Sequence, residues 1–273
     1  MCTEENAKIR AATTYNAASD YYNHPANSFW ARFGRRTVER LDLSPGARVL
    51  DACCGSGASA LPAAEVVGSE GTVLGVDLAH NLLRLAREEA RRRGLRNVDF
   101  RTGDILELGL PDASFDAVVC VFGIFFIPDM QLAVRELWRL VRPGGKLALT
   151  TWGPRFFEPA STAFWDSIRA VRPDLYKTFN PWDQLTDPES LSELMTGAGV
   201  ENVEVVAEAG VHNLETPEDW WAMVMGTGYR GTVEQLDTAD LERVRRENLE
   251  FVHDRDVRSV EANVVYAIGE KNK

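Results

Sequence analysis

From residue 48 onward, short apolar runs alternate with segments in which apolar residues recur at helical spacing. The apolar runs predict strands at 48–50, 72–77, 98–101, 115–122 and 146–151. Between two of these runs, the segment 81–93 places Leu82, Leu85, Ala86 and Ala90 on one face, as in an amphipathic helix. Strands that alternate with helices in this way predict a parallel, doubly wound sheet.

The two ends of the chain depart from this alternation. Residues 4–44 have the spacing of two helical segments, interrupted near Pro25, which suits a helix start. After Trp152 the pattern lapses, and residues 153–185 are rich in proline and aromatic residues. The later segments predict helices at 188–198, 217–225 and 236–253 and strands at 203–206 and 264–268. We expect the last two strands to join the same sheet rather than to build a second domain.

Charge argues against a nucleic-acid partner. The 273 residues carry a formal net charge of -11, which repels a polyanion unless a local basic patch intervenes. The one dense basic run, between Arg84 and Arg96, is interleaved with Glu88 and Glu89 at helical spacing. We favour an ion-paired, solvated helix face there, with a nucleic-acid patch as the alternative.

Segment composition predicts a cytoplasmic protein without a metal. No apolar run approaches the roughly 20 residues that span a bilayer, and the polar, acidic N-terminus lacks the features of a secretory signal. The scattered histidines and the cysteines (Cys2, Cys53, Cys54 and Cys120) lack zinc-ligand spacing. We expect no structural metal and no disulfide.

The richest chemistry follows the first strand, in the turn 51–57. Gly55 and Gly57 let the backbone approach a ligand closely, and the next helix begins just beyond them. Asp77 ends the second strand about 20 residues later, where a carboxylate can accept both hydroxyls of a ribose. Ligands of parallel α/β sheets bind at these strand ends. The residues themselves fit either a dinucleotide or an adenosyl ligand.

The turn departs from the dinucleotide fingerprint, because Cys53 stands where the first glycine of G-x-G-x-x-G would be. Instead, Asp51-x-x-Cys54-Gly55-x-Gly57 resembles the first motif of class I S-adenosylmethionine-dependent methyltransferases. More narrowly, it resembles the small-molecule group of the quinone C-methyltransferase type. Four further segments resemble the family's motifs in order and spacing: 75–78, 103–105, 115–119 and 140–147.

The resemblance implies a cofactor, S-adenosylmethionine, with S-adenosylhomocysteine as product, and a role for each matching residue. Asp51, Cys53, Gly55 and Gly57 would surround the methionine end, with Asp51 near its amino group. Asp77 would hold the ribose hydroxyls. The remaining residues that we expect to bind the cofactor are Leu78, Leu82 and Ile105 at the adenine, Gly103 and Asp104 at its amine, Val121 and Phe122 near the sulfonium, Phe126 beyond them, and Tyr21 as a lid.

One departure from the family bears on the acceptor. Where the family often has a His pair before Pro-Asp, this chain has Phe125 and Phe126. The site therefore lacks the histidine as a proton acceptor and has more apolar surface instead. Such a surface favours a hydrophobic substrate as the recipient of the methyl group. Glu158 and His212 are candidate bases, although a structural role for either is the stronger interpretation.

The expected fold is therefore Rossmann-like α/β: a doubly wound, mostly parallel seven-stranded sheet with a helical N-terminal lid and an inserted cap. We divide the chain into a lid or arm, 1–44, and a methyltransferase domain, 45–273, with an acceptor-binding insert at about 153–200. The helical arm would also offer a surface for a second copy of the chain.

The expected reaction is in-line methyl transfer to a small, aromatic or prenylated acceptor, quinone-like or a secondary metabolite. A protein or nucleic-acid methyltransferase and an NAD(P)-binding oxidoreductase are the alternatives.

Overall fold

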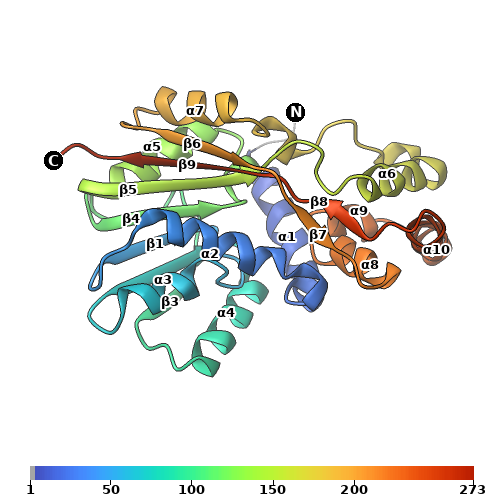
Figure 1. The fold of residues 1–273 in the computed structure, drawn as a ribbon, viewed down its shortest axis with the longest axis horizontal. Coiled ribbons are helices and arrows are strands. Elements are labelled where there is room, and N and C mark those ends of the chain that lie inside the picture. The colour runs from blue at the N-terminus through green and yellow to red at the C-terminus, as the bar shows by residue number, and fades with distance from the viewer. Residues whose placement is uncertain (1–3) are drawn as a thin grey trace.

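A seven-stranded sheet lies at the centre of the structure, a computed structural model that describes residues 4–273 (Figure 1). Its strand order is β3-β2-β1-β4-β5-β9-β6. The strands are β1 (Arg48–Ala52), β2 (Thr72–Asp77), β3 (Val98–Thr102), β4 (Phe115–Val121), β5 (Val141–Trp152), β6 (Glu204–Glu208) and β9 (Val264–Glu270). β1 to β5 pair in parallel, and β9 lies antiparallel between β5 and β6. The predicted mostly parallel sheet is confirmed.

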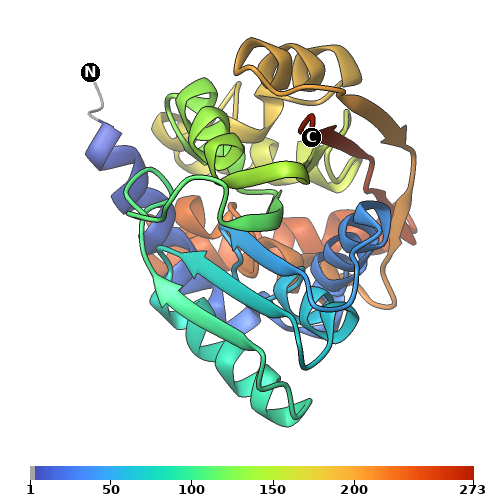
Figure 2. The same cartoon turned by 90° about the vertical axis from the view of Figure 1, so that its left-hand side faces the viewer.

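The central strands are buried on both faces because successive side chains point to opposite apolar clusters. Val49 and Val119 belong to one cluster, and their neighbours Leu50 and Val118 belong to the other. Helices cover the two faces of the sheet (Figure 2). These helices are α2 (Phe29–Leu41), α3 (Ala60–Val67), α4 (His80–Arg92), α5 (Met130–Leu140) and α7 (Pro188–Gly197).

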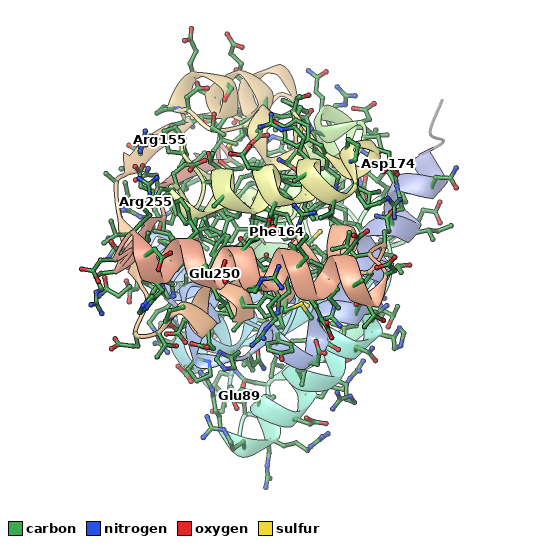
Figure 3. The ribbon with its side chains drawn as sticks, turned by 90° about the vertical axis from the view of Figure 1, so that its right-hand side faces the viewer. Glu89, Arg155, Phe164, Asp174, Glu250 and Arg255 are labelled. Carbon is green, nitrogen blue, oxygen red and sulfur yellow. The ribbon has the colours of Figure 1, made fainter. Side chains whose placement is uncertain are left out.

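A helical cap lies beyond the carboxyl ends of the parallel strands, on the right in Figure 1. It contains α1 (Glu4–Tyr22), α6 (Ala160–Val171), α8 (Pro217–Met225), α9 (Arg230–Val233) and α10 (Thr238–Asp254). In Figure 3, α6 and α10 lie side by side, with Phe164 between them. The cap places these helices over the edge of the sheet where ligands of this fold class bind.

Short elements complete the cap. The strands β7 (Val211–Asn213) and β8 (Ser259–Glu261) form a separate two-stranded sheet. Four 3₁₀ turns link the longer elements: η1 (Pro25–Asn27), η2 (Ile124–Phe126), η3 (Pro173–Leu175) and η4 (Pro181–Gln184).

Three local features differ from the sequence-based expectations. The strand expected at 146–151 begins earlier, because Val141 pairs with Phe115 across a register shift in the β4–β5 ladder and the segment 142–145 continues β5. The sequence pattern does not predict helix α6, because aromatic residues surround its apolar positions on both sides. The cap also extends past the expected boundary at 200, because α8, α9 and α10 pack beside α1 and α6.

Candidate functional site

A cavity of about 90 Å³ lies where β1, β2 and β4 end, underneath helix α1. This volume is below the roughly 300–1,000 Å³ of most small-molecule sites. We call it the donor cavity. Most of the expected cofactor residues line it: Cys53, Gly55, Asp77, Leu78, Leu82, Gly103, Asp104, Ile105, Val121, Phe122 and Phe126.

The turn after β1 bends sharply towards the lid. Cys53 and Gly55 both have left-handed backbone angles, with φ of 58° and 53°. A Cβ on Gly55 would lie 2.9 Å from the Tyr22 hydroxyl, so only glycine lets the loop meet that side chain. Gly57 does not line the donor cavity; a Cβ there would instead crowd the side chains of Leu61 and Phe100.

Asp77 is held in place by backbone amides. Its Oδ2 accepts a hydrogen bond of 2.8 Å from the Gly55 amide, and its Oδ1 accepts one of 2.7 Å from Ala79. Burial raises the pKa of this carboxyl, while these amide donors oppose the rise. Each oxygen keeps a second lone pair, so the carboxylate can still accept hydroxyl donors from a ligand.

Asp51 lies behind the cavity rather than on its wall. The residue is fully buried, and its Oδ2 accepts a 2.7 Å hydrogen bond from the Ser59 hydroxyl. Its Oδ1 is buried without a hydrogen-bond partner. Burial raises the pKa of Asp51 to about 7. The expectation that Asp51 lies beside the ligand's amino group therefore lacks direct geometric support.

Helix α1 closes the far end of the cavity through polar contacts. Lys8 forms an ion pair with Asp104, which also accepts a 2.9 Å hydrogen bond from the Leu106 amide. Farther along the helix, the side-chain oxygen of Asn16 accepts a 2.9 Å hydrogen bond from the Asn81 amide at the start of α4. These contacts hold α1, the segment expected to form a lid, against the α/β core at two points.

The lid tyrosines differ from the one expected. Tyr15 and Tyr22 line the donor cavity, whereas Tyr21 does not: its ring lies near His24 and its carbonyl accepts a hydrogen bond from Asn27. The missed signal was helical periodicity, because Lys8, Ala11, Ala12, Tyr15 and Tyr22 follow the i, i+3, i+4, i+7 spacing of one face.

The cysteine side chains here are thiols without disulfide partners: Cys53, Cys54 and Cys120 are free. Cys2 lies outside the described residues. The pKa of Cys53 is raised by its hydrogen bond with Cys120 and by burial, and that of Cys54 is raised by burial. Neither thiol is therefore activated as a nucleophile.

The two candidate bases lie elsewhere. Glu158 accepts a 2.8 Å hydrogen bond from the Thr162 hydroxyl, and His212 Nε2 lies 2.8 Å from the Ala26 carbonyl, to which it must donate. Burial lowers the pKa of His212, which favours its neutral form. Neither residue lines the donor cavity. These contacts fit the structural role that is the stronger interpretation of both residues from the sequence.

A second, larger cavity of about 720 Å³ adjoins the donor cavity, and we call it the outer cavity. The two share the side chains of Ala11, Tyr15 and Phe126. The Tyr15 and Phe126 rings meet edge to face with centroids 5.5 Å apart. The aromatic residues on its remaining wall come from the aromatic-rich segment: Tyr176, Phe179 and Trp182.

The described residues also bear on metal binding and on membrane insertion. Within residues 4–273, no group of three or more His, Cys, Asp or Glu side chains is arranged to hold a metal ion. Across the same described part of the chain, every helix is too short or too polar to cross a membrane.

Known proteins resemble this chain in sequence and in fold. A family described as a methyltransferase domain matches residues 49–145. Aklanonic acid methyltransferase of Streptomyces sp. strain C5 is 32% identical over 208 residues, which are 72% of this chain and 94% of that protein. Demethylmenaquinone methyltransferase of Listeria welshimeri is 31% identical over 190 residues, which are 66% and 80% of the two chains.

Among solved structures, a SAM (S-adenosylmethionine) dependent methyltransferase from Aquifex aeolicus is similar with a TM-score of 0.55 at 20% identity. The match covers 70% of this chain and 91% of that one, and it shows a shared fold.

These similarities decide between the two ligands that the turn 51–57 allowed. The match covers nearly the whole length of the aklanonic acid methyltransferase. The donor cavity is lined by residues of the motifs that resemble the family. An NAD(P)-dependent oxidoreductase is therefore excluded, and the cofactor is S-adenosylmethionine. The chain belongs to the class I S-adenosylmethionine-dependent methyltransferases.

Proposed function

We propose that this methyltransferase acts on a small, largely hydrophobic acceptor, aromatic or prenylated, of the quinone or secondary-metabolite kind. The observation that carries the proposal is the outer cavity, which meets the donor cavity at Tyr15 and Phe126. Its aromatic side chains suit a flat acceptor, which they can stack against. The named substrates of the two relatives, aklanonic acid and demethylmenaquinone, support the same class.

The donor cavity has the chemistry that S-adenosylmethionine requires. Asp77 presents a carboxylate for the ribose hydroxyls, and Leu78, Leu82 and Ile105 present apolar surface for the adenine. The close approach of Gly55 to Tyr22 leaves a narrow cradle that a Cβ would fill. We assign these residues to the cofactor, together with Tyr15 and Tyr22 in place of Tyr21.

When bound, S-adenosylmethionine would supply a methyl group on a sulfonium: an acceptor nucleophile would bond to the methyl carbon in line, and the broken C–S bond would leave its electron pair on S-adenosylhomocysteine. The protein contributes alignment and exclusion of water. Tyr15 stands at the junction of the two cavities, and burial raises the pKa of its hydroxyl far above neutrality, so it stays protonated. Tyr15 can donate a hydrogen bond to an acceptor but cannot take its proton. An acceptor that is already nucleophilic, such as an enolate or phenolate, suits this site best.

The test is methyl transfer from labelled S-adenosylmethionine to a panel of naphthols, reduced naphthoquinones and prenylated quinols, alongside duplex DNA and bulk protein. We expect transfer to members of the aromatic set. Phe179→Ala, at a side chain that is 58% exposed on the outer cavity, should raise the acceptor KM and leave S-adenosylhomocysteine affinity unchanged.

Val211→Ala is the matched control, because Val211 is 52% exposed on β7, away from both cavities. Transfer to DNA or protein alone, or an unchanged KM in Phe179→Ala for every acceptor, would overturn the proposal.

A further inference from the structure

The outer cavity has an uneven balance of charge. Its wall contains two acids, Asp174 and Glu234, and two cations, Arg10 and Lys177. Asp174 is neutralised by Arg172, whose Nε and Nη2 donate hydrogen bonds of 2.9 and 2.7 Å. Asp174 therefore adds little net negative charge to the wall.

Glu234 is likewise paired within the protein. Arg230 Nε lies 2.6 Å from Glu234 Oε1, one helical turn away. The two carboxylates of the wall thus bring their own counter-charges and present little net charge to the cavity.

The two cations have no such compensation. Among the described residues, neither Arg10 nor Lys177 has a carboxylate partner. The ammonium of Lys177 lies 5.6 Å from the centre of the Trp165 ring. Burial lowers the pKa of Lys177, and the charge of Arg10 lowers it further. Both side chains line the outer cavity.

The cations and the aromatic rings face the same space from different elements. Arg10 lies on α1, and Lys177 lies between η3 and η4, next to Tyr176 and close to Phe179 in the chain. Figure 3 shows Asp174, at the start of this segment, on the side of the molecule where α1 begins. Tyr15 is five residues beyond Arg10 on α1, roughly 7 Å along the helix axis. Both cations line the outer cavity and neither lines the donor cavity, so the cationic pair lies away from the donor cavity.

We propose that the outer cavity takes planar aromatic acceptors that carry a carboxylate, held by Arg10 and Lys177 at the opposite end from the methylated atom. This inference rests on the proposed function and adds the charge of the substrate to it. The aromatic body would stack on Tyr176 and Phe179 while its nucleophilic atom reaches Tyr15. An anion between the two cations removes their repulsion and gains charge-assisted hydrogen bonds.

The test compares two fluorescent probes on the full chain loaded with S-adenosylhomocysteine: 6-hydroxy-2-naphthoate and 2-naphthol, which differ by one carboxylate. We expect the carboxylate probe to bind about tenfold tighter or more, as a charged hydrogen bond allows. In the double variant Arg10→Gln/Lys177→Met, the two probes should bind alike. The control Arg84→Gln/Arg91→Gln removes two exposed cations from α4 and should keep the preference.

The possible results distinguish the anion site from the proposed action on aromatic acceptors. Equal binding of both probes to the unmodified protein, with loss of both in Phe179→Ala, would leave the aromatic acceptor standing and refute the anion site. A preference that survives the double variant would also refute it. Failure of both probes to bind, with no transfer to any aromatic acceptor, would remove the inference and the proposed function together.

Discussion

At the scale of single residues, the donor cavity depends on a few carboxylates whose surroundings differ sharply. Asp77 has both oxygens engaged by backbone amides and faces the cavity. Asp51 is buried behind it with one oxygen unpartnered. The same side chain therefore faces a cavity with lone pairs to spare in one place and is a costly buried group in the other.

Asp77→Ala should weaken S-adenosylhomocysteine binding by about 1–3 kcal/mol, because charged hydrogen bonds to the ribose are lost. Isothermal titration calorimetry measures the change. Asp77→Asn, which keeps the shape and an oxygen acceptor, should lose less. Asp254→Ala, at an exposed carboxylate near the end of α10, is the control and should bind normally. Unchanged affinity in Asp77→Ala would show that the ribose assignment is wrong.

Asp51 should make stability fall as pH rises. Its pKa is about 7 in the fold and about 4 in the unfolded chain, so between these values the folded state holds the extra proton. The free energy of unfolding then decreases with rising pH, by at most about 1.4 kcal/mol per unit. This contribution is complete below pH 4 and is lost through pH 7.

Urea unfolding at pH 5 and pH 7.5 tests this dependence. The unmodified protein should lose more stability over the interval than Asp51→Asn, which cannot ionise, while Asp254→Asn should follow the unmodified protein. Parallel losses in all three proteins would contradict a raised pKa at Asp51.

At the scale of elements, we expect α1 to control the access of the cofactor to the donor cavity. Lys8 and Asn16 join it to Asp104 and to the start of α4. Lys8→Ala removes one of these attachments, and partly exposed ion pairs contribute roughly 0.2–1 kcal/mol. We expect S-adenosylhomocysteine to dissociate up to about fivefold faster, since 1.4 kcal/mol corresponds to a factor of ten.

Stopped-flow displacement measures this rate. Arg84→Ala breaks an exposed ion pair with Glu88 on α4, outside the lid, and should leave the rate unchanged. A Lys8→Ala rate equal to that of the unmodified protein would mean that the ion pair does not hold the lid.

Elements also show where sequence reasoning succeeds. The Gly55 turn and Asp77 are determined locally, by a strand end and a loop, and both were predicted correctly on the cavity wall. Tyr21 was chosen by motif alignment, whereas the helical face of α1 selects Tyr22 instead. The structural contact of His212 could not be predicted, because its partner, the Ala26 carbonyl, lies 186 positions away in the sequence. Local patterns carry no information on such distant contacts.

At the scale of the whole molecule, the cap is assembled from segments far apart in the chain. Asn248 on α10 connects three helices: it accepts a 2.9 Å hydrogen bond from the Trp220 indole of α8 and donates one of 2.9 Å to the Ser167 hydroxyl of α6. All three residues are buried. This network explains why the cap extends to the C-terminal helices, which no boundary based on composition could place.

Asn248→Ala should lower the free energy of unfolding by about 1–3 kcal/mol, because it leaves the Trp220 indole buried without an acceptor. Urea unfolding measures the loss. Arg245→Ala, exposed on the same helix, is the control and should change stability by less than about 0.5 kcal/mol. Equal stability of the two variants would show that the network does not hold the cap.

The wall that Tyr15 and Phe126 form between the two cavities has a consequence for the order of events in catalysis. Helix α1 borders both cavities. We therefore expect an acceptor bound in the outer cavity to restrict the movement of this helix. The nucleoside would then have to enter before the acceptor and leave after the methylated product. Steady-state kinetics should be ordered, with S-adenosylhomocysteine competing with the methyl donor and the methylated product not doing so. The lid would thereby exclude water from the reactive sulfonium until the methyl acceptor binds.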